Sequence, residues 1–401
     1  CVTGDTLILT NLGYTTISSR VGKETIIWNG KEWSTVIPSI TGGNQNMLRV
    51  TFSDGSELTC TTYHKFILKD GSRVEAKDLR VGQQLAKFDR PIIDTGEVID
   101  EQIAYAHGVF SGDGSFNKKV AQVFLYGEKK NLIKYLPYTR IHECTYGDRI
   151  YIDLPQNINW DKTFVPDCSW SIKSRLDWLA GLIDTDGTKN DDEDSIAISS
   201  VNRDFLIRVK LMLDTLGTFS TVSLMKETST KSMPDGNGGT KEYECQDCWR
   251  LVIPAFGVAN LIELGLKLHR VKVTPSPNRE ASKFVTVTSI EDAGIADKVY
   301  CFTEYKNHSG VFNGVMTAQC GEQPLEHGES CVLGSINLMA YVDKVYKKID
   351  WAALSEDIPI MVRLLDDIID TSPYPVPEVE QATKRSRKIG LGIMGWADLL
   401  I

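Results

Sequence analysis

Two cysteines and a histidine are the residues of this sequence whose types could do chemistry on an acyl group. Cys1 opens the stretch CVTGDTLILT, and Cys320 follows Gln319 at the end of VYCFTEYKNHSGVFNGVMTAQC. A thiolate is a strong nucleophile, and cysteine is the side chain that most readily supplies one near neutral pH. The block TCTTYHKF places Thr61 three residues before His64, whose imidazole titrates near neutrality and can act as a general acid or base.

Two carboxylates form a second candidate group. The stretches EQIAYAHGVFSGDGSF and SRLDWLAGLIDTDGTK are both helical apolar runs that end in Asp-Gly, at Asp113 and Asp186, about seventy residues apart. Strand-like segments follow each of them, VAQVFLYG and RIYIDL after the first, SIAISS and WRLVIP after the second, with the helix-like RDFLIRVKLMLDTLG between these last two. This arrangement predicts an internal repeat.

The elements that position these groups change character along the chain. Short β-branched and aromatic runs broken by Asn-Gly and Asp-Gly predict an all-β unit in residues 1–95, and strands return in residues 286–319 after the linker KVTPSPNREASK. Between them, residues 96–285 predict an α+β unit with the repeat. After residue 319 the pattern is mostly helical, from DWAALSEDIPIMVRLLDDIID to SRKIGLGIMGWADLL.

Length and composition bound the class of protein. With 401 residues, 42% of them apolar and 24% charged, the chain can form two or three domains with separate cores. It has no run of eighteen apolar residues and no signal-peptide pattern, so we expect no membrane partner. Nine scattered cysteines without an export signal favour reduced thiols in the cytoplasm. A first residue other than methionine, and an end in mid-pattern at WADLLI, lead us to expect a fragment of a longer reading frame.

These sequence blocks resemble three known protein families. CVTGDTLILT, TCTTYHKF and VYCFTEYKNHSGVFNGVMTAQC resemble the splicing blocks of an intein, whose fold is the all-β Hint type, and together with the inserted repeat they cover residues 1–319. AHGVFSGDG and LAGLIDTDG resemble the two motifs of a LAGLIDADG (DOD-type) homing endonuclease, an α+β fold with a pseudo-twofold axis. CGEQPL, SCVLGSINL and RKIGLGIMGWADLL, in residues 320–401, resemble the catalytic region of a ribonucleotide reductase large subunit, with the vitamin B12-dependent type as one option.

The intein resemblance implies a self-catalysed reaction. Cys1 would attack the preceding carbonyl to make a thioester, while Thr61 and His64 strain and protonate the scissile amide. Cys320 would take over the acyl chain by transthioesterification. Gln319 would then cyclise on its own carbonyl, assisted by His308, and an S-to-N shift would leave a peptide bond.

Three positions depart from the usual intein pattern. Gln319 stands where Asn is the rule, so cyclisation must close a six-membered ring, which we expect to be slower. Ala318 stands where His is usual, which removes a proton donor, and Cys301 stands where Asp is common and could contribute a proton or a thiol contact. These changes put the rate of the last step in doubt.

The endonuclease resemblance implies a metal site. Small residues in both motifs, Ala106, Gly108, Ala180 and Gly181, would let the two helices approach closely, so that Asp113 and Asp186 meet where the negative helix ends add to the attraction for cations. Such hard oxygen ligands suit Mg²⁺, which would promote DNA hydrolysis.

The basic partner of this metal site is harder to place. Lys162 in KTFVP is the candidate, one residue out of the family's register. Residues 96–285 contain 23 Lys and Arg against 26 Asp and Glu, and the whole chain carries a net charge of −9, so DNA binding would need a local basic face.

The reductase resemblance implies roles for three residues after the intein. Cys320 and Glu322, in C-G-E, take the places of the thiyl-radical cysteine and its nearby glutamate, and Cys331 takes that of one of the redox-active pair. Adenosylcobalamin or a metal-radical partner would be the cofactor. An N-terminal host segment would supply the family's Asn, and the DNA target would be double-stranded DNA at the intein-free reductase gene.

Alternatives remain open at several positions. The nuclease could be an inactive passenger, or the chain a reductase precursor fragment; we expect the intein part to be monomeric. A lone T-x-x-H is more often a surface turn than a catalytic pair, and only its combination with the other blocks favours the intein. Cys245-x-x-Cys248 is more often two incidental thiols than a zinc site. The lysine-rich GEKKNLIKYL fits a solvated face or a phosphate contact equally well.

Overall fold

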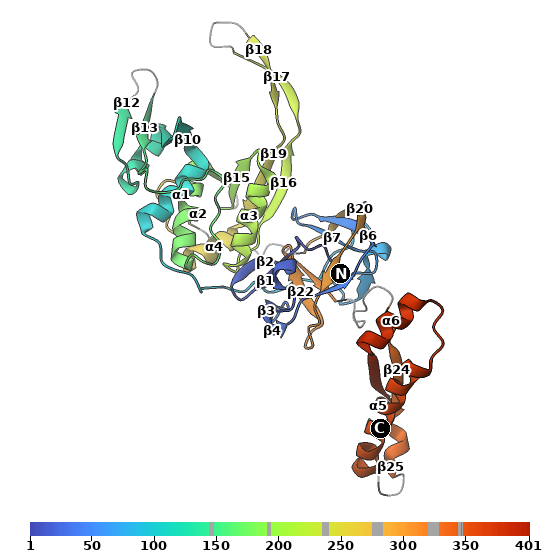
Figure 1. Cartoon of the computed structure of the whole chain (residues 1–401). Helices are drawn as coiled ribbons and strands as arrows, with labels where there is room; N and C mark the ends of the chain where they lie inside the picture. Colours follow the sequence, from blue (N-terminus) through green and yellow to red (C-terminus); the bar gives the residue numbers. More distant parts are fainter. Residues whose placement is uncertain are drawn as a thin grey trace. The chain divides into compact units, whose positions relative to one another are not determined.

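The computed structural model describes residues 1–143, 148–190, 194–234, 240–274, 284–319, 329–343, 346 and 348–401 of the chain. It divides into two compact units, one of Cys1–Ser39, Asn46–Ile295 and Tyr300–Gly321 and another of Ile40–Gln45, Ala296–Val299 and Glu322–Ile401. The fold is mixed, and most of its elements are strands (Figure 1). Within the described residues, no helix combines the length and the apolar character needed to cross a membrane.

Strands from both ends of residues 1–319 share one sheet in the first unit. Its order is β4-β3-β1-β22-β23-β8-β9, with β2 paired to β1. These strands are β1 (Leu7–Thr10), β2 (Gly13–Thr16), β3 (Thr25–Trp28), β4 (Trp33–Val36), β8 (Lys65–Ile67), β9 (Arg73–Glu75), β22 (Ser309–Phe312) and β23 (Val315–Ala318). A second sheet contains β20 (Val287–Ala296), β6 (Gln45–Phe52) and β7 (Glu57–Thr61). The short helices η1 (Ile17–Arg20) and η2 (Ala76–Asp78) also belong to the first unit. The strands β5 (Ser39–Gly42) and β21 (Val299–Cys301) pair with each other. The strands predicted in residues 1–95 and 286–319 are thereby confirmed.

A tight turn aligns the last two strands of this part. Asn313 and Gly314 connect β22 to β23 with φ angles of 48° and 79°. Two successive residues with positive φ are typical of a type I′ hairpin turn, whose twist matches that of the strands, and Asn-Gly is the sequence that adopts it at least cost. A core of buried residues from Val2 to Leu85 and from Val287 to Val315 packs beneath these strands. The Asn-Gly turn therefore fixes the register of the strand that leads to Gln319.

The inserted part repeats a helix followed by an antiparallel sheet. Helix α1 (Glu101–Asp113) leads into β10-β11-β13-β12, and helix α2 (Ile172–Asp186) leads into β14-β15-β19-β16, so both sheets have the same order if the hairpin of β17 (Ser229–Pro234) and β18 (Thr240–Cys245) is set aside. Figure 1 shows that hairpin extending beyond β16 and β19. The remaining elements are β10 (Gly114–Asn117), β11 (Val120–Tyr126), η3 (Gly127–Tyr135), β12 (Arg140–Glu143), β13 (Arg149–Asp153), β14 (Gly187–Lys189), β15 (Ile196–Ser200), α3 (Arg203–Asp214), β16 (Thr221–Lys226), β19 (Cys248–Ile253) and α4 (Ala255–Glu263). The helices and strands predicted for the repeat are confirmed.

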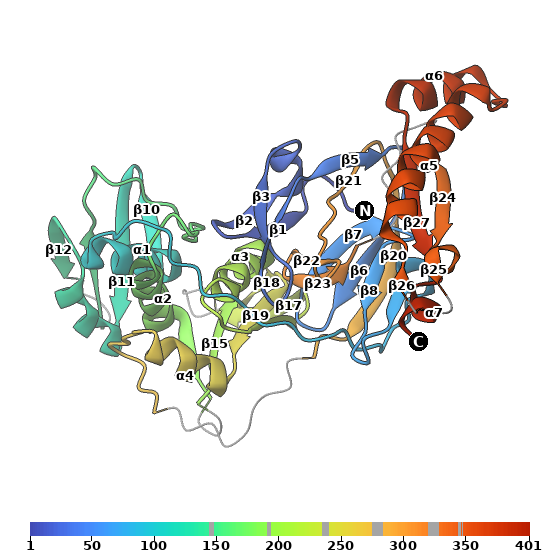
Figure 2. The same ribbon diagram turned by 90° about the horizontal axis from the view of Figure 1, so that it is seen from below.

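Residues 329–401 combine helices with a parallel pair of strands. Strands β24 (Val332–Asn337) and β27 (Ile389–Met394) pair along their whole length beside helix α5 (Trp351–Thr371), as Figure 2 shows. The other elements are η4 (Leu338–Tyr341), β25 (Val342–Asp343), β26 (Lys348–Ile349), α6 (Pro377–Ser386) and α7 (Trp396–Leu400). We expected a helical pattern through SRKIGLGIMGWADLL, but its first half is β27. Glycine disfavours a helix interior, and the partner strand lies more than fifty residues earlier, so local periodicity did not indicate it.

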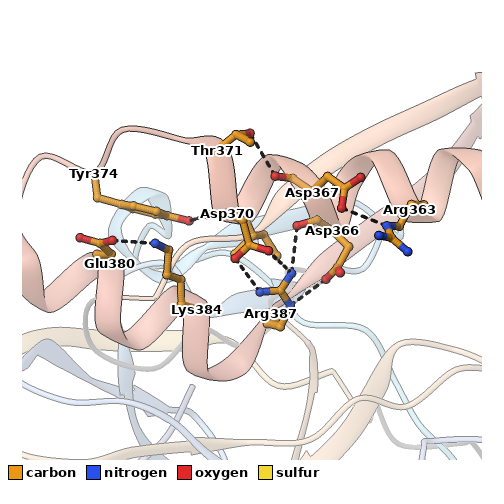
Figure 3. Close-up of polar contacts among 10 residues, drawn as sticks. Arg363, Asp366, Asp367, Asp370, Thr371, Tyr374, Glu380, Lys384 and Arg387 are labelled. Carbon is orange, nitrogen blue, oxygen red and sulfur yellow. Dashed lines mark hydrogen bonds and ion pairs between the residues drawn. The ribbon is translucent and has the colours of Figure 1, made fainter.

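An arginine holds α5 and α6 together. Arg387, in the left-handed conformation just after α6, donates from Nε to the Asp366 carboxylate at 2.9 Å and from Nη1 and Nη2 to the two oxygens of Asp370, each at 2.9 Å. Figure 3 shows this fork beside the Lys384–Glu380 and Arg363–Asp367 pairs. Bidentate geometry of this kind fixes orientation as well as distance.

Candidate functional site

Cys1 is held between strands from opposite ends of the intein-like segment. Val2, which is 1% exposed, bridges to Cys60 on one side and to Tyr300 on the other. Its N–H donates to the Tyr300 carbonyl at 2.9 Å, and the Cys1 carbonyl accepts from the Thr61 N–H at 2.9 Å. The first residue of the chain is therefore buried, with a fixed backbone.

Thr61 and His64 both contact the nitrogen of Cys1. This nitrogen donates to Thr61 Oγ1 at 3.1 Å and lies 3.2 Å from His64 Nδ1. His64 Nε2 lies 2.9 Å from Thr317 Oγ1, and all three of these side chains are fully buried. The residue Thr317, which motif reading did not single out, thereby links the imidazole to the strand that ends at Gln319.

A turn in residues 304–308 holds Gln319. The Gln319 N–H donates to the His308 carbonyl at 3.0 Å, and its side-chain oxygen Oε1 accepts from the Glu304 N–H at 2.8 Å. The side-chain nitrogen Nε2 is buried and finds no hydrogen-bond partner among the residues that the structure describes. The amide is thus fixed through its oxygen while its nitrogen makes no such bond there.

The other residues predicted from the intein and reductase blocks are less closely assembled. The side chain of His308 is exposed, and its backbone carbonyl accepts the hydrogen bond from the Gln319 N–H. Cys301 is buried next to Tyr300, and its thiol lies 3.6 Å from the Phe302 carbonyl. Cys331 is half-buried and directly precedes β24. Cys320 and Glu322 lie outside the described residues.

Helices α1 and α2 pack through their glycines, as the small residues predict. A Cβ placed on Gly108 would lie 1.8 Å from the Trp178 carbonyl oxygen, and one on Gly181 would lie 2.1 Å from the Tyr105 oxygen. Near the helix ends, a Cβ on Gly112 would lie 3.2 Å from Cγ of Asp186. Contact this close brings the carboxyl-terminal ends of α1 and α2 together.

Asp113 and Asp186 lie at those helix ends with a lysine beside them. Lys129 Nζ contacts Asp113 Oδ2 at 2.7 Å, and Lys162 Nζ donates to the Gly114 carbonyl at 2.7 Å. Burial raises the pKa of Asp186, and the negative charge of Asp113 raises it further, against the opposing charges of Lys129, Lys162 and Arg270. Two carboxylates that repel each other, with helix carbonyl ends nearby, make up an oxygen-rich group suited to a hard divalent cation. The residues therefore fit Mg²⁺.

Asp184, two residues before Asp186 on α2, holds backbone N–H groups. Its carboxylate is fully buried and accepts from the N–H groups of His269, Arg270 and Val271 at 2.8, 2.8 and 3.1 Å. The Tyr105 hydroxyl donates to it at 2.9 Å. Its oxygens are thus occupied in holding residues 269–271 against α1 and α2. In the described part of the chain, no cluster of three or more His, Cys, Asp or Glu residues suited to a metal occurs.

One lysine and one glutamate extend the predicted sites. Lys129 comes from GEKKNLIKYL, which forms η3, so at least this lysine faces a carboxylate and not only solvent. Cys248 is half-buried, whereas the side chain of Cys245 lies outside the described residues. Glu304 is buried at the start of the turn that holds Gln319. Only its position inside the block VYCFTEYKNHSGVFNGVMTAQC could have drawn attention to it.

Comparison with known proteins gives a family and several relatives. The family model of the ribonucleotide reductase barrel domain matches residues 115–401. The ribonucleoside-diphosphate reductase large subunit of Invertebrate iridescent virus 6 is 35% identical over 432 residues, covering 100% of this chain and 44% of the relative. The vitamin B12-dependent ribonucleoside-diphosphate reductase of Thermoplasma acidophilum is 53% identical over 85 residues, covering 21% of this chain and 11% of the relative. The chain thus spans less than half of the relatives it matches.

Two solved structures are also similar in part. A DnaB intein from Synechocystis matches with a TM-score of 0.28 at 8% identity, over 79% of this chain and 96% of that one. The homing endonuclease I-DmoI in complex with DNA and calcium matches with a TM-score of 0.28 at 14% identity, over 44% of this chain and 94% of that one. Because both scores are low, the assignment of the sites rests on their residues. The chain belongs to the ribonucleotide reductase family, and its residues 1–319 carry the sequence motifs of an intein with an embedded homing endonuclease.

Proposed function

We propose that residues 1–319 are an intein that removes itself from a ribonucleotide reductase large subunit. The observation that carries this is the contact of His64 Nδ1 and Thr61 Oγ1 with the nitrogen of Cys1, at 3.2 and 3.1 Å. When a residue precedes Cys1, this nitrogen is the amide nitrogen of the scissile bond. A general acid must lie within hydrogen-bond reach of the atom that it protonates, and His64 does.

The first step follows from that contact. The Cys1 thiolate forms a bond to the preceding carbonyl carbon, the C–N bond to Cys1 breaks, and the nitrogen takes a proton from His64. Thr317 Oγ1, 2.9 Å from Nε2, holds the imidazole with Nδ1 toward Cys1. The product is a thioester and a free amine, which balances without any further reactant.

The later steps use the other end of the intein. The Cys320 thiolate displaces the Cys1 thiolate from the thioester. The Gln319 nitrogen Nε2 then bonds to its own carbonyl carbon, the bond to the Cys320 nitrogen breaks, and the proton lost by Nε2 reaches that nitrogen. The released amine attacks the thioester and restores a peptide bond in the host.

We propose that residues 96–285 cut double-stranded DNA at the intein-free reductase gene. Asp113 and Asp186 would hold Mg²⁺, which when bound supplies Lewis-acid activation of water and stabilises the leaving oxygen. Lys129, paired with Asp113 at 2.7 Å, places a positive charge where a phosphate would lie. The Lys162 ammonium donates to the Gly114 carbonyl and adds a second positive charge close to Asp186.

For the host we propose ribonucleotide reduction. Cys320 would become the radical cysteine after splicing, with Glu322 beside it and Cys331 in the redox pair. The match to the Thermoplasma relative is 85 residues long, close to the length of residues 320–401, and that relative is vitamin B12-dependent, so adenosylcobalamin is the proposed cofactor. The viral relative aligns with the whole chain, which supports a counterpart of residues 1–319 within it.

Splicing is tested with the full chain preceded by a short peptide. Mass spectrometry should find the peptide ligated to residues 320–401, and a free 1–319 product that is lighter by one water at Gln319 than its hydrolysed form. His64→Ala should slow thiol-induced cleavage at Cys1 by roughly 10²-fold or more, because general acid catalysis contributes that much. His142→Ala, a change in β12 outside the proposed splicing residues, supplies the matched control. Unchanged thiolysis in His64→Ala would overturn the assignment.

DNA cleavage is tested with a duplex that spans the intein-free junction. We expect cutting that requires Mg²⁺ and is lost in Asp186→Asn, while Asp204→Asn, an exposed change on α3, cuts normally. If the wild-type protein splices but leaves every such duplex intact in Mg²⁺, residues 96–285 are an inactive nuclease.

A further inference from the structure

The buried carboxylate of Glu304 organises the turn on which Gln319 rests. Its oxygens accept from the N–H of Lys306 at 2.9 Å, from the N–H of Asn307 at 2.7 Å and from Asn29 Nδ2 at 3.3 Å. The Ser34 hydroxyl donates to it as well. A charged group that is fully buried is costly unless it is hydrogen-bonded in this way, so its contacts define the turn.

The ionised state of Glu304 is secured by these contacts. Burial acts to raise the pKa of Glu304, but the hydrogen bonds from Ser34, Lys306, Asn307 and Asn29 together hold the pKa below its ordinary value. The carboxylate is therefore negative over the neutral range and accepts all of these bonds.

The same turn grips Gln319 at two points. The Glu304 N–H donates to Gln319 Oε1 at 2.8 Å, and His308, at the other end of the turn, accepts from the Gln319 N–H at 3.0 Å. His308 has a φ of 50°, a conformation that a non-glycine residue adopts only when its surroundings hold it there. The two grips keep both the side-chain amide and the backbone of Gln319 in place.

These two hydrogen bonds to Gln319 would favour the cyclisation of its side chain, which we expect to be slow. Loss of a proton from Nε2 leaves an amidate whose negative charge is shared with Oε1, where the Glu304 N–H is already aimed. As Nε2 bonds to the Gln319 carbonyl carbon, that charge passes to the backbone carbonyl oxygen, and it leaves with the Cys320 nitrogen, which takes a proton, when the bond to that nitrogen breaks. Nε2 itself makes no hydrogen bond to the described residues, so attack requires none to be broken there. Orientation matters more for a six-membered ring, since the longer side chain has one more rotatable bond to restrict.

We propose that Glu304 is a positioning residue for the last splicing step: its carboxylate fixes the 304–308 turn, and that turn presents the Gln319 amide to its own carbonyl. The inference rests on the proposed function, because it concerns the cyclisation of Gln319. It assigns a role that compensates in part for Ala318, the position where a proton donor is usual.

The test separates the two ends of the reaction in the full chain preceded by a short peptide. Thiol-induced cleavage before Cys1 reports the first step, and release at Gln319–Cys320 reports the last. Glu304→Ala should slow the last step by roughly 10²-fold, as a displacement of about 1 Å does, with the first step within about twofold of wild type. Glu304→Gln, which keeps the shape but not the charge, should restore part of the loss.

Glu32→Gln is the matched control. Glu32 contacts the same turn through Lys306, at 2.7 Å, but this pair is about half exposed on both sides. Surface pairs contribute little, so both rates should stay at the wild-type level.

The possible outcomes distinguish a failure of the Glu304 inference from a failure of the proposed splicing function. An unchanged last step in both Glu304 variants overturns the inference, and so does an equal loss of both steps in both variants, since Glu304 would then support the fold as a whole. A wild-type precursor that never releases a cyclised Gln319 instead contradicts the proposed function itself.

Discussion

At the scale of single residues, the proposed splicing centre contains one imidazole with partners on both sides. His64 is fully buried, with the Cys1 nitrogen near Nδ1 and Thr317 Oγ1 near Nε2. In an imidazole, the hydrogen bond that one ring nitrogen makes determines whether the other ring nitrogen carries the proton. We therefore expect Thr317 to affect the reaction at Cys1, the amino-terminal junction, although it lies in β23, the strand that precedes the carboxyl-terminal junction at Gln319.

Thr317→Val should slow the first step while leaving the fold intact. The change keeps the side-chain shape but removes the oxygen that holds Nε2, and a loss of about 1.4 kcal/mol in the transition state is tenfold in rate. Thiolysis before Cys1 measures it. Thr317→Ser keeps the hydroxyl and should react close to the wild-type rate; if the serine variant is as slow as the valine variant, packing and not the hydrogen bond is responsible.

Asp186→Asn should raise stability without divalent cations. The folded-state pKa of Asp186 is raised by burial and by Asp113, so ionised Asp186 is disfavoured in the fold. Stability from this group is fully present below its unfolded pKa and is lost as the pH rises through the folded pKa. At pH 7.5 we expect the asparagine variant to unfold roughly 2–4 °C higher than wild type, which corresponds to about 1 kcal/mol, and the gain to vanish in acid.

Calorimetry with Mg²⁺ completes this measurement. The cation should raise the Tm of the wild-type protein, because it binds the folded state, and should raise that of the variant much less. A variant that is less stable than wild type at both pH values, with no response to Mg²⁺ in either protein, would contradict both the repulsion and the site.

At the scale of elements, helix α3 joins the nuclease part to the splicing part through buried charges. Lys210 Nζ lies 3.0 Å from Asp54 Oδ2, with both side chains 1% exposed, and it donates to Ser56 Oγ at 2.9 Å. A Cβ on Gly314, in the turn before β23, would lie 3.1 Å from Asp214 and 3.2 Å from Lys210. The helix thus supports the hairpin whose second strand carries Thr317.

Lys210→Met should be strongly destabilising. Removal of one partner of a buried ion pair leaves an uncompensated charge and costs about 3–5 kcal/mol. Chemical denaturation should show this loss, and the double variant with Asp54→Asn should recover much of it. Lys173→Met, at an exposed pair, is the control. A small loss for Lys210→Met would mean that water reaches Asp54.

What the sequence could predict depended on whether a residue lay in a recognisable local pattern. Cys1, Thr61 and His64 stand in motif blocks, and the structure brings them within hydrogen-bond distance. Glu304 and Thr317 also lie in a motif block, VYCFTEYKNHSGVFNGVMTAQC, but their residue types there indicate no role, and only long-range contacts bring them to the centre. The strand β27 is of the same kind, since its partner β24 is distant in sequence.

At the scale of the whole molecule, three polar contacts besides that of Lys210 connect residues 1–95 to helix α3. Arg203 donates to Glu57 and to the Gly55 carbonyl, at 2.6 and 2.9 Å, and Arg90 pairs with Asp214. Every splicing residue nevertheless lies outside residues 96–285. We therefore expect residues 96–285 to support the proposed splicing site without contributing a residue to its chemistry.

Replacing residues 96–285 by a short linker should retain the first splicing step but lower stability. Asp54 would lose Lys210, and the surface beneath α3 would meet water. We expect thiolysis near the wild-type rate at low temperature and a Tm lower than that of the same fold within the full chain. Adding Asp54→Asn to the shortened protein should recover part of the difference. Loss of thiolysis at low temperature would show instead that the nuclease part is required for the site.

The pairing of Val2 with both Cys60 and Tyr300 also has a consequence for the time course of synthesis. A ribosome that adds about 5–20 residues per second needs roughly 15–60 s to reach residue 300 after residue 1. Until then Val2 has only one of its two neighbours, and β1 lacks β22. The nascent chain therefore cannot assemble the groups around Cys1 early, so its peptide backbone stays uncut until nearly all of the excisable segment has been translated.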